Sequence, residues 1–195
     1  MIVGTYAFDL VVGGFDVTDP GQLDRLWTNR FVIVPASADQ VTTISIEIRA
    51  DSNQDAVTMV LSHLATAVPE VTVERIDLDL VTTTEIAIRL GVDREAVRKW
   101  AAGERRSTES FPPHFARLPG GQKAQKVWRW ASIYAWAIYC CPSQLSADLP
   151  EPLSPTVVDR FNGSLPLGGL QPCVGDFPPT SWSWLATDSI LVNPR

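Results

Sequence analysis

The sequence predicts an α+β protein made of three consecutive segments, residues 1–78, 79–141 and 142–195. In the first segment, apolar residues recur at period two in some stretches and at helical spacing in others. The second segment contains two short helices with clear start and stop signals, followed by a hairpin signal. The third segment holds nine of the 15 prolines. Because proline removes a backbone donor and interrupts helices, we expect an irregular Pro/Gly-rich tail there.

The composition excludes several classes of protein. Apolar residues make up 45% of the chain and charged residues 19%, so the chain can bury a core and is not globally disordered. No apolar run approaches the roughly 18–20 residues needed to cross a bilayer. Residues 1–9 lack the basic region and the long apolar stretch of a secretory signal. We therefore expect a cytoplasmic protein with no membrane partner.

Four strands are predicted in the first segment. Ile44, Ile46 and Ile48 alternate with polar residues, which is the pattern of a half-buried strand. Residues 6–12 show the same period. The two remaining strands are indicated by short apolar runs, at residues 31–34 and from residue 71 onward.

Two helices are predicted between these strands. The first follows Asp19 and Pro20, because the missing N–H of proline costs little at the first helical position. The second starts after Ser52 or Asn53, presents apolar residues at helical spacing and ends at Pro69. The resulting order, with two helices able to cover one sheet face, predicts a ferredoxin-like βαββαβ sandwich for residues 1–78. This fold hosts many activities and indicates none by itself.

Few residues of the chain are suited to metal binding or catalysis. Of the three cysteines, Cys140 and Cys141 are adjacent and Cys173 is distant, and the histidines His63 and His114 are far apart. A structural zinc site needs about four well-spaced ligands, so we expect no metal. Neither a phosphate-binding glycine loop nor a His-Glu-x-x-His pattern occurs. We expect no cofactor and no enzymatic activity.

The charge is unevenly distributed. The net charge is −6, yet residues 79–139 carry 10 basic and 6 acidic groups. Residues 1–78 carry 4 basic and 11 acidic groups, and residues 140–195 carry 2 basic and 5 acidic groups. Since charges act over about a Debye length, the local excess decides what the middle segment attracts. A polyanion is therefore a possible partner of this segment despite the negative total.

The middle segment has the signals of a helix-turn-helix. Thr82 and Glu85 fit a capping box that starts a helix. Gly91 fits the position after the helix, where positive φ is cheap only for glycine, and Asp93 is a good cap for a second helix. The apolar residues expected between the two helices are Ile86, Leu90, Val92, Val97 and Trp100.

A hairpin and a closing helix are expected to complete the domain. An extended run from Phe111 to Arg117, the turn signal at residues 119–121 and the aromatic stretch at 127–130 predict a β-hairpin, or wing. A last helix is expected at residues 132–140. Together these elements predict a winged helix-turn-helix over residues 79–141.

The basic and polar residues of this segment are the candidate DNA contacts. Arginine can donate two bonds to a guanine edge, and lysine can donate to phosphate. The four tryptophans of this segment, at positions 100, 128, 130 and 136, are expected in the core rather than as platforms for bases. The candidate contact residues are Thr83, Thr84, Arg94, Glu95, Arg98, Lys99, Arg105, Arg106, Lys123, Lys126 and Arg129.

Residues 80–137 resemble the MerR-like and excisionase-like winged-helix DNA-binding domains, in particular small actinobacterial or phage DNA-binding proteins of unassigned function. The resemblance rests on the stretches at residues 84–87, 91–97, 111–112, 128–130 and 134–136. It implies binding to double-stranded DNA, as a transcriptional regulator or as an excisionase or architectural factor, and association with the nucleoid when bound. The sequence departs from the family at Asp93 and Ala131, where serine or threonine is common.

Two questions stay open at this level. Pro142 ends the last helix before any long coiled coil, so a homodimer would have to form through residues 1–78. Alternatively, the acidic segment 1–78 binds a protein partner, and the chain is an adaptor or an antitoxin-like module.

Overall fold

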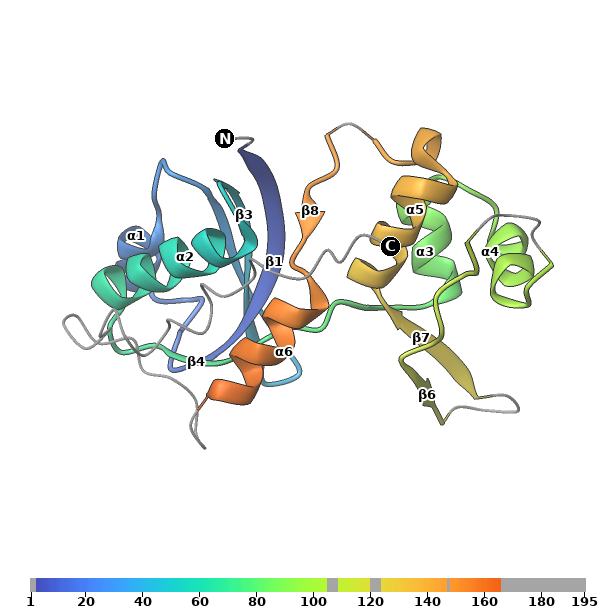
Figure 1. Cartoon of the computed structure of the whole chain (residues 1–195). Helices are drawn as coiled ribbons and strands as arrows, with labels where there is room; N and C mark the ends of the chain where they lie inside the picture. Colours follow the sequence, from blue (N-terminus) through green and yellow to red (C-terminus); the bar gives the residue numbers. More distant parts are fainter. Residues whose placement is uncertain (1–2, 105–108, 120–123, 147, 166–195) are drawn as a thin grey trace. The chain divides into compact units, whose positions relative to one another are not determined.

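The computed structural model describes residues 3–104, 109–119, 124–146 and 148–165 (Figure 1). The chain has a mixed α+β fold and divides into two compact units. Unit 1 comprises Met1–Asp77 together with Thr156–Arg195, and unit 2 comprises Leu78–Pro155.

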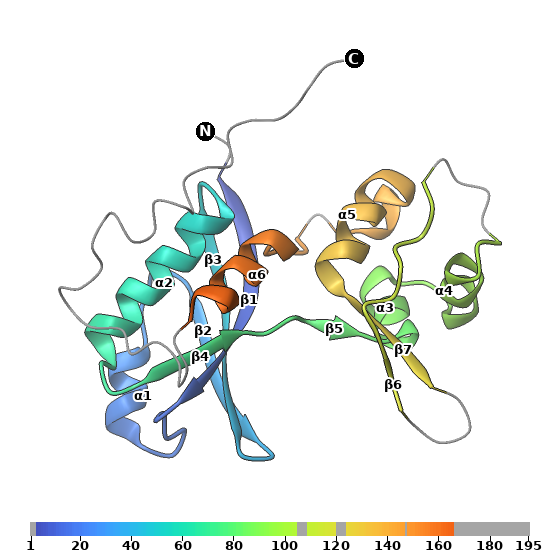
Figure 2. The ribbon, with the colours of Figure 1, turned by 60° about the horizontal axis from the view of Figure 1, so that its bottom comes forward.

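Unit 1 is built on four antiparallel strands in the order β2-β3-β1-β4. The strands are β1 (Gly4–Gly13), β2 (Val32–Ala38), β3 (Val41–Ala50) and β4 (Thr72–Ile76). The helices are α1 (Pro20–Leu26), α2 (Asn53–Ala67) and α6 (Pro155–Ser164). Figure 2 shows α1 and α2 on the same side of this sheet.

One face of the sheet forms the core of unit 1. Ile44, Ile46 and Ile48 of β3 are buried, and the residues between them are exposed, so the strand prediction for this stretch is confirmed. Ile46 lies opposite Phe8 of β1, which is also buried. The first two helices begin as predicted, because Asp19 accepts the N–H of Gly21 and the Ser52 side chain accepts the N–H of Asp55.

The prediction of an irregular tail from residue 142 is wrong for residues 155–164, which form α6. Pro155 stands at the first position of this helix, where proline does not interrupt the hydrogen-bond ladder. Val158 and Phe161 are buried, and the Asn162 side chain bonds both the N–H and the C=O of Ile76 in β4, at 2.8 and 2.9 Å. The tail beyond residue 165 lies outside the described residues.

Unit 2 contains two helices, a hairpin and a third helix in chain order. Its sheet has the strand order β5-β7-β6. The strands are β5 (Leu80–Val81), β6 (Ala116–Leu118) and β7 (Gln125–Arg129). The other elements are α3 (Thr83–Leu90), α4 (Arg94–Ala101), α5 (Trp130–Cys140), the 3-10 turn Pro142–Gln144 and β8 (Glu151–Pro152).

The predicted start and stop signals of α3 and α4 are confirmed. The Thr82 hydroxyl accepts the N–H of Glu85, and the Glu85 carboxylate accepts the N–H of Thr82, which lowers the pKa of that carboxyl. Gly91 ends α3 with a φ of 62°, and the Asp93 side chain accepts the N–H of Glu95 at 2.6 Å. The sequence therefore determines locally where both helices begin and where α3 ends.

The core of unit 2 is aromatic. Trp128, Trp130 and Trp136 are at most 7% exposed, and Trp100 packs against them, so the prediction that the tryptophans of this segment lie in the core is confirmed. The residues expected between α3 and α4 pack there as well, with Ile86, Leu90 and Val97 fully buried and Val92 partly buried.

Helix α5 starts two residues earlier than predicted. It begins at Trp130, whose backbone N–H donates to the carbonyl of Asp79 at 2.9 Å. The guanidinium of Arg89 bonds both carboxylate oxygens of Asp79, at 2.7 and 2.8 Å, and lies 5.0 Å from the Trp130 ring centroid. These contacts between distant positions, rather than a local cap, fix the start of the helix.

None of the described helices reaches the length and hydropathy of a membrane span.

Candidate nucleic-acid interface

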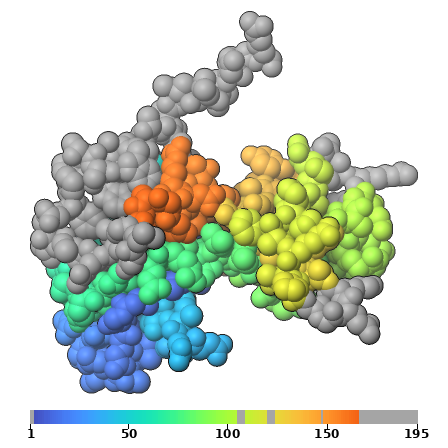
Figure 3. All heavy atoms as spheres, turned by 90° about the horizontal axis from the view of Figure 1, so that it is seen from below, coloured from blue at the N-terminus to red at the C-terminus, as the bar shows by residue number. Residues whose placement is uncertain are grey.

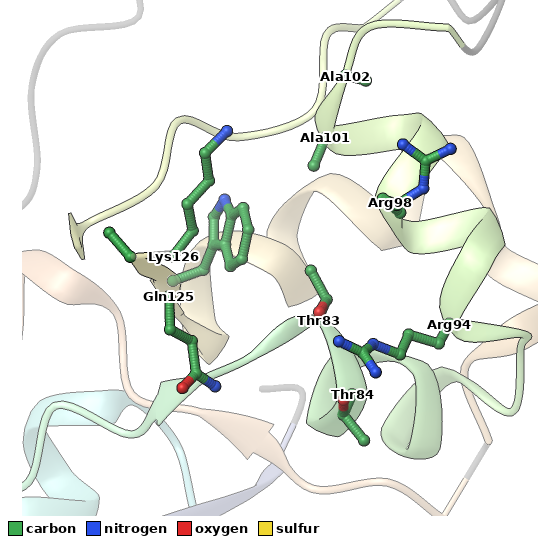
Figure 4. A pocket seen from close by; sticks show the side chains of 10 residues that line it. Thr83, Thr84, Arg94, Arg98, Ala101, Ala102, Gln125 and Lys126 are labelled. Atoms are coloured by element: carbon green, nitrogen blue, oxygen red, sulfur yellow. The ribbon is translucent and has the colours of Figure 1, made fainter. Parts of the chain in front are cut away.

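An open groove of about 610 Å³ lies on the surface of unit 2 between α4, the start of α3 and β7 (Figure 4). Five candidate contact residues line it, three of them basic. Among the described lining side chains none carries a carboxylate, so the lining itself is basic although the whole chain is acidic. The lining residues are Thr83, Thr84, Arg94, Arg98, Ala101, Ala102, Ala124, Gln125, Lys126 and Trp128.

Helix α4 directs its two arginines to the groove because of its spacing. Val97 is fully buried and anchors one face of the helix. Arg94 and Arg98 are four residues apart and therefore lie one above the other on a neighbouring face. Both are exposed, and Figure 4 shows Arg94 extending toward the start of α3. Within the part of the chain that the structure describes, the Arg94 guanidinium forms no ion pair, so it is available to a ligand.

Arg98 is held by its neighbour in the helix. Its Nε and Nη2 atoms donate to the two carboxylate oxygens of Glu95, at 2.7 and 2.6 Å. This bond lowers the pKa of Glu95 and raises that of Arg98, because each charge stabilises the other. The side chains of Arg98 and Glu95 remain 60% and 52% exposed, so the pair stands in solvent at the rim of the groove.

The β6–β7 hairpin carries a second pair of cations. Arg117 of β6 and Lys126 of β7 are directly opposite in the antiparallel register, and both are exposed. Like charges in this arrangement repel each other and destabilise a hairpin, whereas an anion between them removes the repulsion. The Nε of Arg117 donates to His114 Nε2 at 3.1 Å. Arg117 was not among the predicted contacts, although the predicted extended run ended on it.

The remaining candidate residues lie elsewhere. Glu95 and Lys99 are exposed on α4 but do not line the groove. The guanidinium carbon of Arg129 lies 4.5 Å from the ring centroid of Phe115, so the side chain packs on the hairpin instead of facing the groove. Arg105, Arg106 and Lys123 lie outside the described residues. Figure 3 shows the hairpin (yellow) and α4 (light green) exposed on the same face of unit 2.

Unit 1 has a groove of its own, of about 440 Å³, between the end of α1 and the exposed side of β2 and β3. Trp27, at its edge, is 56% exposed. Arg30 and Arg49 also line it, and they are two of only four basic residues in positions 1–78. An exposed tryptophan beside two arginines is the composition found where protein surfaces bind one another.

Neither unit offers a metal site in its described part, where no three His, Cys, Asp or Glu side chains converge. The chain matches no family model, no curated protein and no solved structure. The geometry of the two grooves is therefore the basis for assigning a function.

Proposed function

We propose that the chain binds double-stranded DNA through unit 2, as a sequence-specific regulator or as an excisionase or architectural factor. The observation that carries this proposal is the convergence of Arg94, Arg98 and Lys126 on one groove whose described lining holds no carboxylate. These cations come from two elements separated in the chain, a helix and a hairpin. Basic residues scattered over a flat surface would not place three cations around one groove.

The order of elements in unit 2 supports a winged helix-turn-helix of the MerR-like or excisionase-like kind. Two eight-residue helices flank the left-handed turn at Gly91, and the hairpin and α5 follow. An α-helix with its side chains is about 10–12 Å wide, and the major groove of B-DNA is about 12 Å wide. In the proposed complex α4 enters the major groove and the β6–β7 hairpin lies over the phosphates. For unit 1 we propose a ferredoxin-like fold, which the order β2-β3-β1-β4 supports.

Each part of the groove has a defined task in this proposal. Arg94 and Arg98 donate to guanine O6 and N7 and provide the sequence preference. Thr83 and Thr84, in the first turn of α3, place hydroxyls and free backbone N–H groups where a phosphate can accept from them. Lys126 contacts the backbone regardless of sequence.

Selection of duplexes from a random pool tests the proposal. We expect the full-length protein to enrich one sequence motif. We also expect its affinity to fall with salt at a log–log slope of about −4 to −5, since the 10 basic residues of 79–139 are enough to neutralise about four to six phosphates. A palindromic motif would indicate a dimer. Failure to enrich any motif, together with an affinity that does not respond to salt, would refute DNA binding by this groove.

A second candidate function, self-association through unit 1, is favoured by the groove at Trp27. No long helix continues from α5, because Pro142 follows it and starts a 3-10 turn. We therefore propose that two copies associate through the surface formed by Trp27, Arg30 and Arg49. A surface of this composition would equally suit a different protein partner, as in an adaptor or an antitoxin-like module.

Light scattering of the full chain distinguishes these cases. We expect the wild-type protein at micromolar concentration to have twice the 21.4 kDa chain mass. The variant Trp27→Ala is expected to shift toward the monomer, because an exposed anchor residue is lost without disturbing the core. A wild-type mass equal to one chain would rule out self-association.

A further inference from the structure

The carboxylate of Glu95 is a feature of α4 that DNA binding in general does not explain. It is bonded to Arg98 at the rim of a groove whose described lining side chains are neutral or basic. A negative charge there opposes phosphate binding. Its ion pair with Arg98 contributes little to folding, because an exposed i,i+3 pair stabilises a helix only weakly. As the acidic residue of the first turn, Glu95 also stabilises the start of α4, but this role does not require a bond to a groove arginine. The bidentate bond to Arg98 therefore indicates a task in recognition as well.

The hydrogen bonds of Glu95 decide which edge of Arg98 remains available. Glu95 occupies the Nε–H and one N–H of Nη2. The N–H groups left over are those of Nη1 and the second one of Nη2. Two of them point away from the side-chain stem in parallel, which is the end-on fork that matches O6 and N7 of guanine.

We propose that Glu95 is a positioning residue that holds Arg98 with its end-on fork toward one guanine of the bound duplex. This inference rests on the proposed DNA binding. It adds that the recognised base is a guanine and that Glu95 increases the selectivity for it. An unheld arginine side chain can turn to a phosphate or to another acceptor, whereas the paired one is ordered before it meets DNA. Glu95 therefore lowers affinity for DNA in general and raises discrimination.

The test measures discrimination, defined as the ratio of affinities for the selected duplex and for duplexes with each guanine replaced by adenine. We expect Glu95→Gln to lower this ratio about fivefold or more at one position, because the amide offers one neutral acceptor in place of two charged ones and no longer holds the fork in both bonds. Its affinity for a random-sequence duplex is expected to rise about twofold, since one negative charge is lost near the phosphates. A change of structure alone would not move these two quantities in opposite directions.

A double-variant cycle identifies the partner of Glu95. Arg98→Lys keeps the charge and removes the fork, so discrimination at the same position is lost. We expect Glu95→Gln to have no further effect on discrimination in the Arg98→Lys background. Glu74→Gln, an equal charge change at an exposed site of unit 1, should leave the ratio unchanged.

Two outcomes would overturn the inference. Unchanged discrimination in Glu95→Gln would show that the carboxylate does not position Arg98. A further loss in the Arg98→Lys background would show that Glu95 acts without Arg98, for instance by accepting directly from a cytosine amino group. Both presuppose a wild-type protein that selects a motif. If it selects none, the reading of a guanine by Arg98 is refuted, whereas DNA binding by the groove is refuted only if the affinity also does not respond to salt.

Discussion

The double variant Arg94→Ala/Arg98→Ala is expected to bind the selected duplex at least about 30-fold more weakly than the wild-type protein. Each arginine that donates to a base edge contributes about 1–3 kcal/mol, and 1.4 kcal/mol is a factor of ten in affinity. The two side chains lie on the same face of α4 and line the same groove, so their removal takes away the basic part of the helix surface there. Helix α4 itself should remain, because alanine is a strong helix former.

The measurement is a titration by fluorescence anisotropy at fixed salt. The matched control is Arg25→Ala/Arg75→Ala, which removes two exposed arginines from unit 1 and changes the net charge equally. This control should change affinity less than about twofold, because neither arginine lines the groove. If both double variants lose affinity equally, net charge rather than the groove governs binding.

The variant Trp128→Ala is expected to lower the free energy of unfolding of unit 2 by about 3–5 kcal/mol. The Trp128 side chain is 2% exposed, and its Nε1 donates to the carbonyl of Pro112 at 3.0 Å. Its ring lies 5.8 Å from that of Phe111, on the segment that leads into the hairpin. Alanine would leave a cavity and an unsatisfied carbonyl, and β7 would lose its largest buried side chain.

Trp27→Ala is the matched comparison, because it removes the same side chain where 56% of it is exposed. Its effect on unfolding, measured at a protein concentration low enough for the wild type to be monomeric, should stay within about 1 kcal/mol. Urea unfolding of the full chain, followed by circular dichroism, gives both values. A loss below about 1 kcal/mol in Trp128→Ala would mean that Trp128 does not anchor the hairpin.

The features that were predicted correctly from the sequence depend on neighbours in the chain. The capping box at Thr82 and Glu85, the turn at Gly91 and the alternation at residues 44–48 are each determined within a few positions. Such signals act before any tertiary contact forms. The turn between β2 and β3 could not be predicted in this way. Asp39 and Gln40 both adopt positive φ there, without the glycine that normally marks such a turn.

The part of the candidate site that was not predicted depends on contacts between distant residues. Arg94 and Arg98 followed from helical spacing, and both line the groove. The opposition of Arg117 and Lys126 requires the hairpin register, which the sequence does not specify. The packing of Arg129 on Phe115 requires the fold of the whole hairpin. Helix α6 was missed because the nine prolines of residues 142–195 outweighed the apolar spacing of its buried residues.

The two bonds from Asn162 to Ile76 have a consequence for how this protein can be divided. The Asn162 side-chain amide makes the two hydrogen bonds that a neighbouring strand would otherwise make to the edge strand β4. A fragment of residues 1–78 would leave the edge of β4 open and would lose the buried Phe161 side chain from its core. Such a fragment would be prone to aggregate through its open edge, so any self-association it shows would not report on the intact molecule.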